Sequence, residues 1–148
     1  MFNLEKQDLK NQKVIIRVDF NVPLDDNFNV TDTTRIEACK ETVDLIISNG
    51  GSCILISHFG RPKEREDKFS LKHIVETVSE VLNHPVVFHN DCIGDEVQEV
   101  ISNLKRGDII LLENLRFYKE ETLGDSMFAE ELSKLGDIYV NDAFGTCH

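Results

Sequence analysis

The chain has 148 residues, with 16 Lys or Arg against 27 Asp or Glu, and its formal net charge is −11 at pH 7. This excess of negative charge argues against a nucleic-acid-binding protein, which needs basic side chains to neutralise phosphates. The chain is 41% hydrophobic and 29% charged, which is typical of a globular protein and not of a disordered one. Its length predicts one compact domain.

The composition also bears on compartment and metal content. No apolar stretch reaches the roughly 20 residues of a membrane-spanning helix, and the N-terminus lacks an apolar run of signal-peptide length. The four cysteines, Cys39, Cys53, Cys92 and Cys147, have neither C-x-x-C nor zinc-finger spacing. We therefore expect a cytoplasmic protein with reduced thiols, without a bound metal and without a nucleic-acid or membrane partner.

Predicted strands and helices alternate along the chain. A strand at 14–20 precedes a helical pattern at 36–47, and the later strands at 53–57, 86–88 and 109–112 precede helical patterns at 71–82, 97–104 and 127–135; a last strand follows at 138–140. Several strands are apolar throughout, as in a parallel sheet covered on both faces. The order predicts an α/β fold: a doubly wound parallel sheet of about five strands with helices on both faces, Rossmann-like but incomplete after the fifth strand.

Capping residues support the helix boundaries. Thr34 with Glu37 three residues later forms a capping-box pattern, which places Arg35 in the first turn of the first helix. Ser70 is a predicted N-cap of the next helix.

The segments that follow the strands carry the candidate chemistry. Ligands of open α/β sheets bind beyond the carboxyl ends of the strands, where Arg61 and Arg116 are expected together with Arg35. Guanidinium groups donate paired hydrogen bonds to phosphate or carboxylate and keep their charge, so this edge, the arginine rim, suits a small anion. Asp19 and Asn21 would accept hydrogen bonds from hydroxyl groups of such a ligand.

Other site classes find little support in the sequence. Neither the phosphate-binding G-x-x-x-x-G-K-[ST] motif nor G-x-G-x-x-G is present. The acidic segment from Asp25 has Val30 and Ile36 where a calcium loop requires glycine and glutamate, so we expect a polar turn there. His58 follows a buried strand and is a candidate ligand contact, whereas His73 is expected to be an ordinary surface residue.

Four motifs resemble the phosphoglycerate kinase family in its N-terminal, substrate-binding domain. They are RVDFNVPL at 17–24, SHFGRP at 57–62, LENLRF at 112–117 and YVNDAFGT at 139–146. The resemblance covers essentially the whole chain, with Phe59 and Cys147 standing where the family usually has leucine and alanine. It implies that residues 1–148 are the 3-phosphoglycerate-binding domain of a longer enzyme, truncated at the C-terminal side and without the nucleotide-binding domain.

The resemblance also implies a reaction and a set of residues. The complete, monomeric, glycolytic enzyme would transfer a phosphoryl group between 1,3-bisphosphoglycerate and ADP, giving 3-phosphoglycerate and ATP. Mg-ATP or Mg-ADP would bind to the absent C-terminal domain, so this chain alone would bind no cofactor and would not turn over. The implied substrate-binding residues are Asp19, Phe20, Asn21, Arg35, His58, Phe59, Gly60, Arg61 and Arg116. Arg35 would also be catalytic, by stabilising charge on the transferred group.

Two other functions are compatible with parts of the sequence. A stand-alone anion-binding or regulatory module would use the same arginine rim without catalysis. A phospho-acceptor domain of flavodoxin-like type is less favoured, because it needs an acidic cluster where this chain has arginines. Because a truncated domain would lack the cover of its fifth strand, we expect exposed apolar surface on that strand or its flanking helices.

Overall fold

The computed structural model describes residues 8–62, 65–118 and 126–141, with side chains from residue 130 onward in the last segment. Strands and helices alternate in it as the sequence predicts. In chain order the elements are β1 (Lys13–Arg17), α1 (Thr34–Glu37), α2 (Lys40–Ser48), β2 (Ser52–Ile56), the 3₁₀ helices η2 (Asp67–Phe69) and η3 (Leu71–His73), α3 (Val75–Leu82), β3 (Val86–His89), α4 (Asp95–Ser102), β4 (Ile109–Leu112), the 3₁₀ helix η4 (Leu115–Phe117), α6 (Ser126–Ser133) and β5 (Ile138–Asn141).

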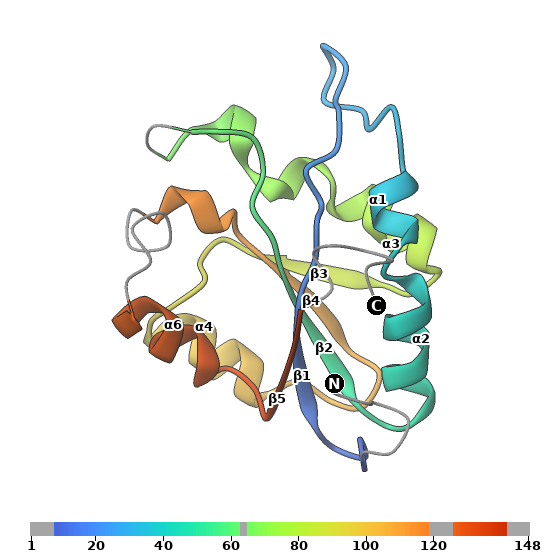
Figure 1. Cartoon of the computed structure of the whole chain (residues 1–148), viewed down its shortest axis with the longest axis vertical. Helices are drawn as coiled ribbons and strands as arrows, with labels where there is room; N and C mark the ends of the chain where they lie inside the picture. The colour runs from blue at the N-terminus through green and yellow to red at the C-terminus, as the bar shows by residue number, and fades with distance from the viewer. Residues whose placement is uncertain (1–7, 63–64, 119–125, 142–148) are drawn as a thin grey trace.

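The strands form one parallel sheet in the order β3-β4-β2-β1-β5. The connections β1 to β2 and β2 to β3 cross the sheet in one direction, whereas β3 to β4 and β4 to β5 cross it in the other. Because crossovers between parallel strands are right-handed, connections of opposite direction lie on opposite faces. Accordingly, α1, α2 and α3 cover one face and α4 and α6 cover the other (Figure 1). The predicted doubly wound fold is therefore confirmed.

Each face of the sheet has its own apolar core. In β1, Val14 and Ile16 pack with residues of α2 and α3, whereas Ile15 between them packs with residues of α4 and α6. All residues of the central strands β2 and β4 are buried, but the edge strands are not: Val87 of β3 is 62% exposed and Tyr139 of β5 is 48% exposed. Tyr139 is the exposed large hydrophobic residue among the described residues of the fifth strand, and the predicted apolar surface there stays a prediction.

The first strand is shorter than predicted. It ends at Arg17 and not at residue 20, although the Val18 amide still donates to the Ile56 carbonyl, at 2.9 Å. Beyond that point the Phe20 amide donates to Ser57 Oγ, at 2.9 Å. A side chain therefore replaces the backbone ladder, and the chain leaves the sheet toward the arginine rim.

The first helix departs from its predicted form in two ways. It is divided into α1 and α2, because the Ile36 carbonyl accepts from Cys39 N and Sγ, both at 3.3 Å, in a tighter turn than an α-helix makes. The predicted capping box is wrong: the helix N-cap is Thr33, and the Thr34 amide donates to Asp32 Oδ1 at 2.9 Å. Arg35 nevertheless lies in the first turn of α1, as predicted.

The second helix begins later than predicted. Residues 71–73 form η3, and the α-helix α3 runs from Val75 to Leu82. Ser70 caps η3 as expected, since its hydroxyl accepts from the Lys72 amide at 3.2 Å.

Candidate functional site

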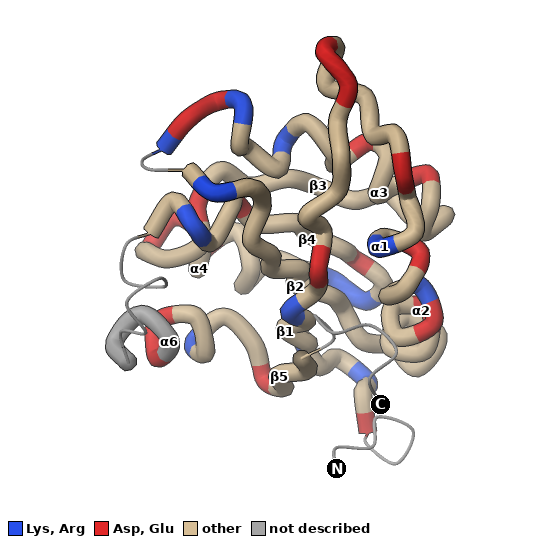
Figure 2. The backbone as a smooth tube through the Cα atoms, turned by 45° about the horizontal axis from the view of Figure 1, so that its top comes forward, with Lys and Arg blue, Asp and Glu red and all other residues tan. Residues whose placement is uncertain are grey.

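The arginine rim lies where three neighbouring strands end. Because β4, β2 and β1 are adjacent and parallel, the segments that follow them leave the sheet at the same edge. Those segments carry Arg116, Arg61 and Asp19, and α1 brings Arg35 to the same edge. Figure 2 shows Lys and Arg positions on the loops beyond β2 and β4 and beside α1, at this end of the sheet. The four charged residues that the sequence predicts at the rim thus come from separate segments.

Arg35 is held by the segment that follows β1. Its Nη1 donates to the Asn21 carbonyl at 2.8 Å and to Asp19 Oδ1 at 3.3 Å. The Arg35 side chain is still 52% exposed, and the Asp19 side chain is 31% exposed. Both hydrogen bonds use Nη1, and the one to Asp19 uses only Oδ1. Arg35 Nη2 and Asp19 Oδ2 therefore have no partner among residues 8–62, 65–118 and 126–141 and are available to a ligand.

Asn21 also fixes the loop that follows β2. Its Oδ1 accepts from the Gly60 amide at 2.8 Å. Gly60 has a φ of +62°, a left-handed conformation that glycine adopts without strain. A Cβ at Gly60 would lie 2.5 Å from the Phe69 ring, so only glycine fits under that ring. The start of Arg61's loop is therefore held against the segment after β1.

His58 lies within the field of the rim arginines. Burial holds its pKa below the usual value of 6.5, and Arg116, Arg17 and Arg35 lower it further, against the opposing charge of Asp19. The imidazole is consequently neutral at pH 7. An anion bound beside it would offset the arginine charges and favour its protonated form.

Asn114 holds together the segments that carry the rim. Its fully buried side chain accepts from the Phe59 and Arg116 amides, both at 3.0 Å, and donates to the carbonyls of Phe59 at 2.6 Å and Phe69 at 2.9 Å. One carboxamide thus joins the segment after β2, the end of η2 and the segment after β4. Asn114 lies in the LENLRF motif, and the signal for its role is a polar residue two positions after an apolar strand, a pattern that by itself did not predict these contacts.

Glu113 and Ser57 are buried organisers of the same kind. Glu113 accepts from the Ser70 hydroxyl at 2.7 Å and from the Leu71 amide at 2.9 Å, which fixes η3 beside the end of β4. Ser57 accepts from Phe20 N and donates to the His58 carbonyl at 2.8 Å. Their polar groups are occupied within the fold, so they position the rim and are not available to a ligand.

Arg61 and Arg116 are the free cations of the rim. Both side chains are exposed, and neither guanidinium has a hydrogen bond or ion pair among the residues that the structure describes.

By contrast, Phe20 and Phe59 are 0% and 5% exposed and belong to the core. Their amides donate to Ser57 and Asn114, so both residues have a packing role in the fold, and the ligand contact that the resemblance implied for them stays a prediction.

A second cluster braces the loop that carries Arg61. Arg65 donates to the Asn90 carbonyl at 3.1 Å and to the Tyr118 hydroxyl at 3.2 Å, and its guanidinium lies 5.2 Å from the centre of the Phe117 ring. The Tyr118 hydroxyl in turn donates to Asp91. Burial raises the pKa of Tyr118, so this phenol stays protonated and can donate. The cluster ties together the loops that follow β2, β3 and β4.

The dipole of helix α1 contributes little to the positive charge of the rim. The helix beside Asp19 and Asn21, α1, has only four residues, and aligned peptide dipoles need a longer helix to add appreciably. Positive charge at the rim therefore comes from side chains, above all from guanidinium groups.

The structure describes three of the four cysteines and only part of the last motif. Cys39, Cys53 and Cys92 are buried free thiols, and burial raises the pKa of both Cys53 and Cys92. Cys147 and the part of the last motif from residue 142 onward lie outside the described residues. Within the described part of the chain, no group of three or more His, Cys, Asp or Glu could hold a metal ion, and no helix is long and apolar enough to cross a membrane.

Comparison with known proteins gives a consistent result. A family model described as phosphoglycerate kinase matches residues 4–148. The chain is 48% identical over 145 residues to phosphoglycerate kinase of Aquifex aeolicus (strain VF5), and 52% identical over 145 residues to the Arabidopsis thaliana protein named phosphoglycerate kinase 3, cytosolic. Each match covers 98% of this chain and 36% of the relative.

A solved structure is similar over the same part. The crystal structure of phosphoglycerate kinase from Pyrococcus horikoshii OT3 matches with a TM-score of 0.86 and 34% identity, covering 100% of this chain and 38% of that chain. The chain therefore spans little more than a third of the length of the relatives that it matches.

Proposed function

The chain belongs to the phosphoglycerate kinase family, and on that premise we propose that its arginine rim binds the acid substrate of the family's reaction. The substrate would be 3-phosphoglycerate or 1,3-bisphosphoglycerate, in a phosphoryl transfer between 1,3-bisphosphoglycerate and ADP. The observation that carries the proposal is that the guanidinium groups of Arg61 and Arg116, on the segments after two adjacent strands, have no partner within the described part of the chain. They supply fixed positive charge for a phosphate and a carboxylate.

The remaining rim residues have distinct roles in this proposal. Asp19 Oδ2 accepts from the substrate hydroxyl, while Asp19 Oδ1 and the Asn21 carbonyl orient Arg35. Arg35 stabilises negative charge on the phosphoryl group as it is transferred, which in phosphoryl transfer is largely a matter of position and electrostatics. His58 and Gly60 complete the anion site from the loop after β2.

We place the nucleotide outside the described residues. They offer no acidic cluster for a metal ion, and the sequence has no phosphate-binding loop. Our proposal therefore assigns Mg-ATP and Mg-ADP to another domain of the complete enzyme and derives no step through them here. It also includes a monomeric complete enzyme and a cytoplasmic location, the latter supported by the name of the cytosolic Arabidopsis relative.

Titration with 3-phosphoglycerate, followed by amide NMR shifts, tests the binding site. We expect shifts at Arg35, His58, Arg61 and Arg116, and loss of binding in Arg116→Gln. The matched control is Arg106→Gln, which removes an exposed arginine from the turn before β4 and should leave the affinity unchanged. Absence of shifts at high millimolar ligand would contradict the proposal.

An activity assay tests whether catalysis needs a second domain. The chain alone should form no ATP from 1,3-bisphosphoglycerate and Mg-ADP, because it carries only the acid-substrate side of the reaction. Appreciable ATP formation by the chain alone would overturn the claim that catalysis needs a second domain.

A further inference from the structure

An apolar cavity adjoins the arginine rim and takes no part in the function proposed above. Its volume is about 300 Å³, at the lower end of the range for small-molecule sites. Val22 and Phe59 line it from the core side, and Leu24, Phe28 and Phe69 line it from the outside. Asn21 and Gly60 border both the cavity and the rim, so a ligand can reach from one into the other.

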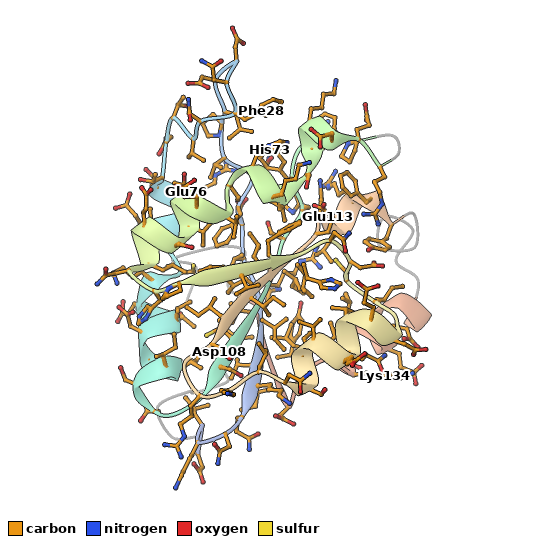
Figure 3. The ribbon with its side chains drawn as sticks, turned by 180° about the vertical axis from the view of Figure 1, so that it is seen from behind. Phe28, His73, Glu76, Asp108, Glu113 and Lys134 are labelled. Atoms are coloured by element: carbon orange, nitrogen blue, oxygen red, sulfur yellow. The ribbon has the colours of Figure 1, made fainter. Side chains whose placement is uncertain are left out.

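The outer wall of the cavity is held in place by contacts within the fold. Residues 24–30 form a short hairpin closed by an antiparallel bridge between Leu24 and Val30. At its tip the Phe28 ring stacks on His73, with ring centres 4.2 Å apart and planes inclined by 15° (Figure 3). His73 Nε2 lies 2.8 Å from the Asp67 carbonyl oxygen. His73 is thus an anchor of the hairpin and not the ordinary surface residue that the sequence suggested.

The tip of the hairpin has an unusual backbone conformation. Phe28 has a φ of +64°, which is rare for a bulky residue, and the residue is 39% exposed beside the cavity. On the opposite side the Phe69 ring lies against Gly60, where it leaves no room for a Cβ. Both walls are therefore fixed by the fold, and the cavity is formed before any ligand arrives.

The hydrogen-bonding groups that remain unused around the cavity are donors. Both carboxylate oxygens of Asp25 already accept hydrogen bonds, from the amides of Asn27 and Asn29 and from the Asn29 side chain. Among the described residues, Asn21 Nδ2 has no hydrogen-bond partner, and Lys68 Nζ has only a contact with the Phe69 ring, at 5.1 Å. The unused groups are thus an amide donor and an ammonium, beside the guanidinium groups of the rim.

We propose that this cavity binds the apolar body of an amphipathic anion, such as an aryl or branched alkyl phosphonate or carboxylate, whose charged head lies on the arginine rim. The five apolar side chains match the body of such a ligand, and the donors of Asn21, Lys68 and the rim match its head. Because the head occupies the rim, a ligand of this class competes with the acid substrate. The inference rests on the function proposed for the rim and adds a ligand class to it.

Three probes distinguish binding in the cavity from binding at the rim. They are inorganic phosphate, methylphosphonate and phenylphosphonate, each titrated into the chain and followed by NMR. Phenylphosphonate should bind about tenfold more tightly than methylphosphonate, because its ring leaves water for an apolar site. It should also shift resonances of Val22, Phe28 and Phe69, which the other two probes leave in place.

Two variants and a control locate the effect. Leu24→Trp fills the cavity and should abolish the preference for phenylphosphonate while leaving the phosphate affinity unchanged. Phe28→Ala removes one wall of the cavity without adding bulk and should reduce the preference for phenylphosphonate over methylphosphonate. It tests the proposal even if the tryptophan of Leu24→Trp prevents folding. Val87→Ala changes an exposed apolar residue on the opposite edge strand and should leave all three affinities as they are.

The outcomes distinguish this inference from the proposed function. If phosphate causes no shifts at Gly60 and Arg116, the anion site itself is refuted. If phosphate binds there but the two phosphonates bind equally, the rim stands and the cavity proposal is overturned. A preference for phenylphosphonate that persists in a folded Leu24→Trp variant would also overturn it.

Discussion

Asn114 is the residue whose loss should damage the arginine rim most. Its buried carboxamide makes four hydrogen bonds, to both backbone groups of Phe59, to the Phe69 carbonyl and to the Arg116 amide. Asn114→Ala removes all four and leaves two N–H and two C=O groups without these partners. The affected groups belong to three segments that meet at the rim, so the change acts on stability and on anion binding together.

The size of the effect follows from the hydrogen bonds. Each contributes about 0.5–1.5 kcal/mol net, so four contribute roughly 2–6 kcal/mol, and we expect a loss of about 4 kcal/mol in the free energy of unfolding. That is a large fraction of the 5–15 kcal/mol or so that stabilises a typical domain. The affinity for 3-phosphoglycerate should fall at least about tenfold, because misplacing Arg116 by even a fraction of an ångström weakens a directional ion pair.

Urea unfolding followed by far-UV circular dichroism measures the loss of stability, and titration with 3-phosphoglycerate measures the loss of affinity. Hydrogen exchange shows whether the Phe59 and Arg116 amides have lost their protection. The matched control is Asn103→Ala, which removes an exposed carboxamide whose Nδ2 donates to the Glu99 carbonyl at 3.0 Å. It should change the free energy of unfolding by no more than about 0.5 kcal/mol.

A small effect on both the free energy of unfolding and the protection of the amides would refute this role of Asn114. If Asn114→Ala costs less than about 1 kcal/mol and the amides of Phe59 and Arg116 remain as protected as in the parent chain, the buried carboxamide does not hold the rim together.

Two further predictions concern the surroundings of the rim. Tyr118→Phe removes the hydroxyl that accepts from Arg65 and donates to Asp91, and urea unfolding should show a loss of about 1–2 kcal/mol; an unchanged midpoint would contradict the bracing role. The pKa of His58, held below 6.5 by burial and by Arg116, should rise when sulfate occupies the rim. Sulfate should therefore bind more tightly as the pH falls through that pKa, and an NMR titration of the imidazole that is the same with and without sulfate would refute this.

The sequence was most informative where local chemistry decides the structure. Apolar runs such as residues 109–112 are strands because β-branched and aliphatic side chains suit a sheet covered on both faces. Arg61 and Arg116 follow such runs directly, so their position at one edge of the sheet followed from the topology of parallel strands. The Thr34 capping box failed because Asp32 and Thr33 offer competing polar side chains within two residues.

The direction of a side chain was harder to predict than its place in the chain. Phe20 and Phe59 lie in rim motifs, but both point into the core, since neighbouring residues of an extended segment face opposite sides. Ser57, Glu113 and Asn114 could be placed near the rim from the sequence. Their roles depend on the groups that they meet, and those groups belong to other segments.

By itself, the sequence determined the alternation of strands and helices, the sign and chemistry of the rim, and the family to which its motifs point. Only the tertiary structure decided that Asn21 meets Gly60 across 39 residues and that Asn114 meets Phe59 across 55. It alone also decided that a hairpin tip anchored on His73 encloses an apolar cavity beside the arginines. The physical reason is that strand pairing and helix capping follow local patterns, whereas the shape of a site depends on loops whose contacts form only when distant segments are brought together.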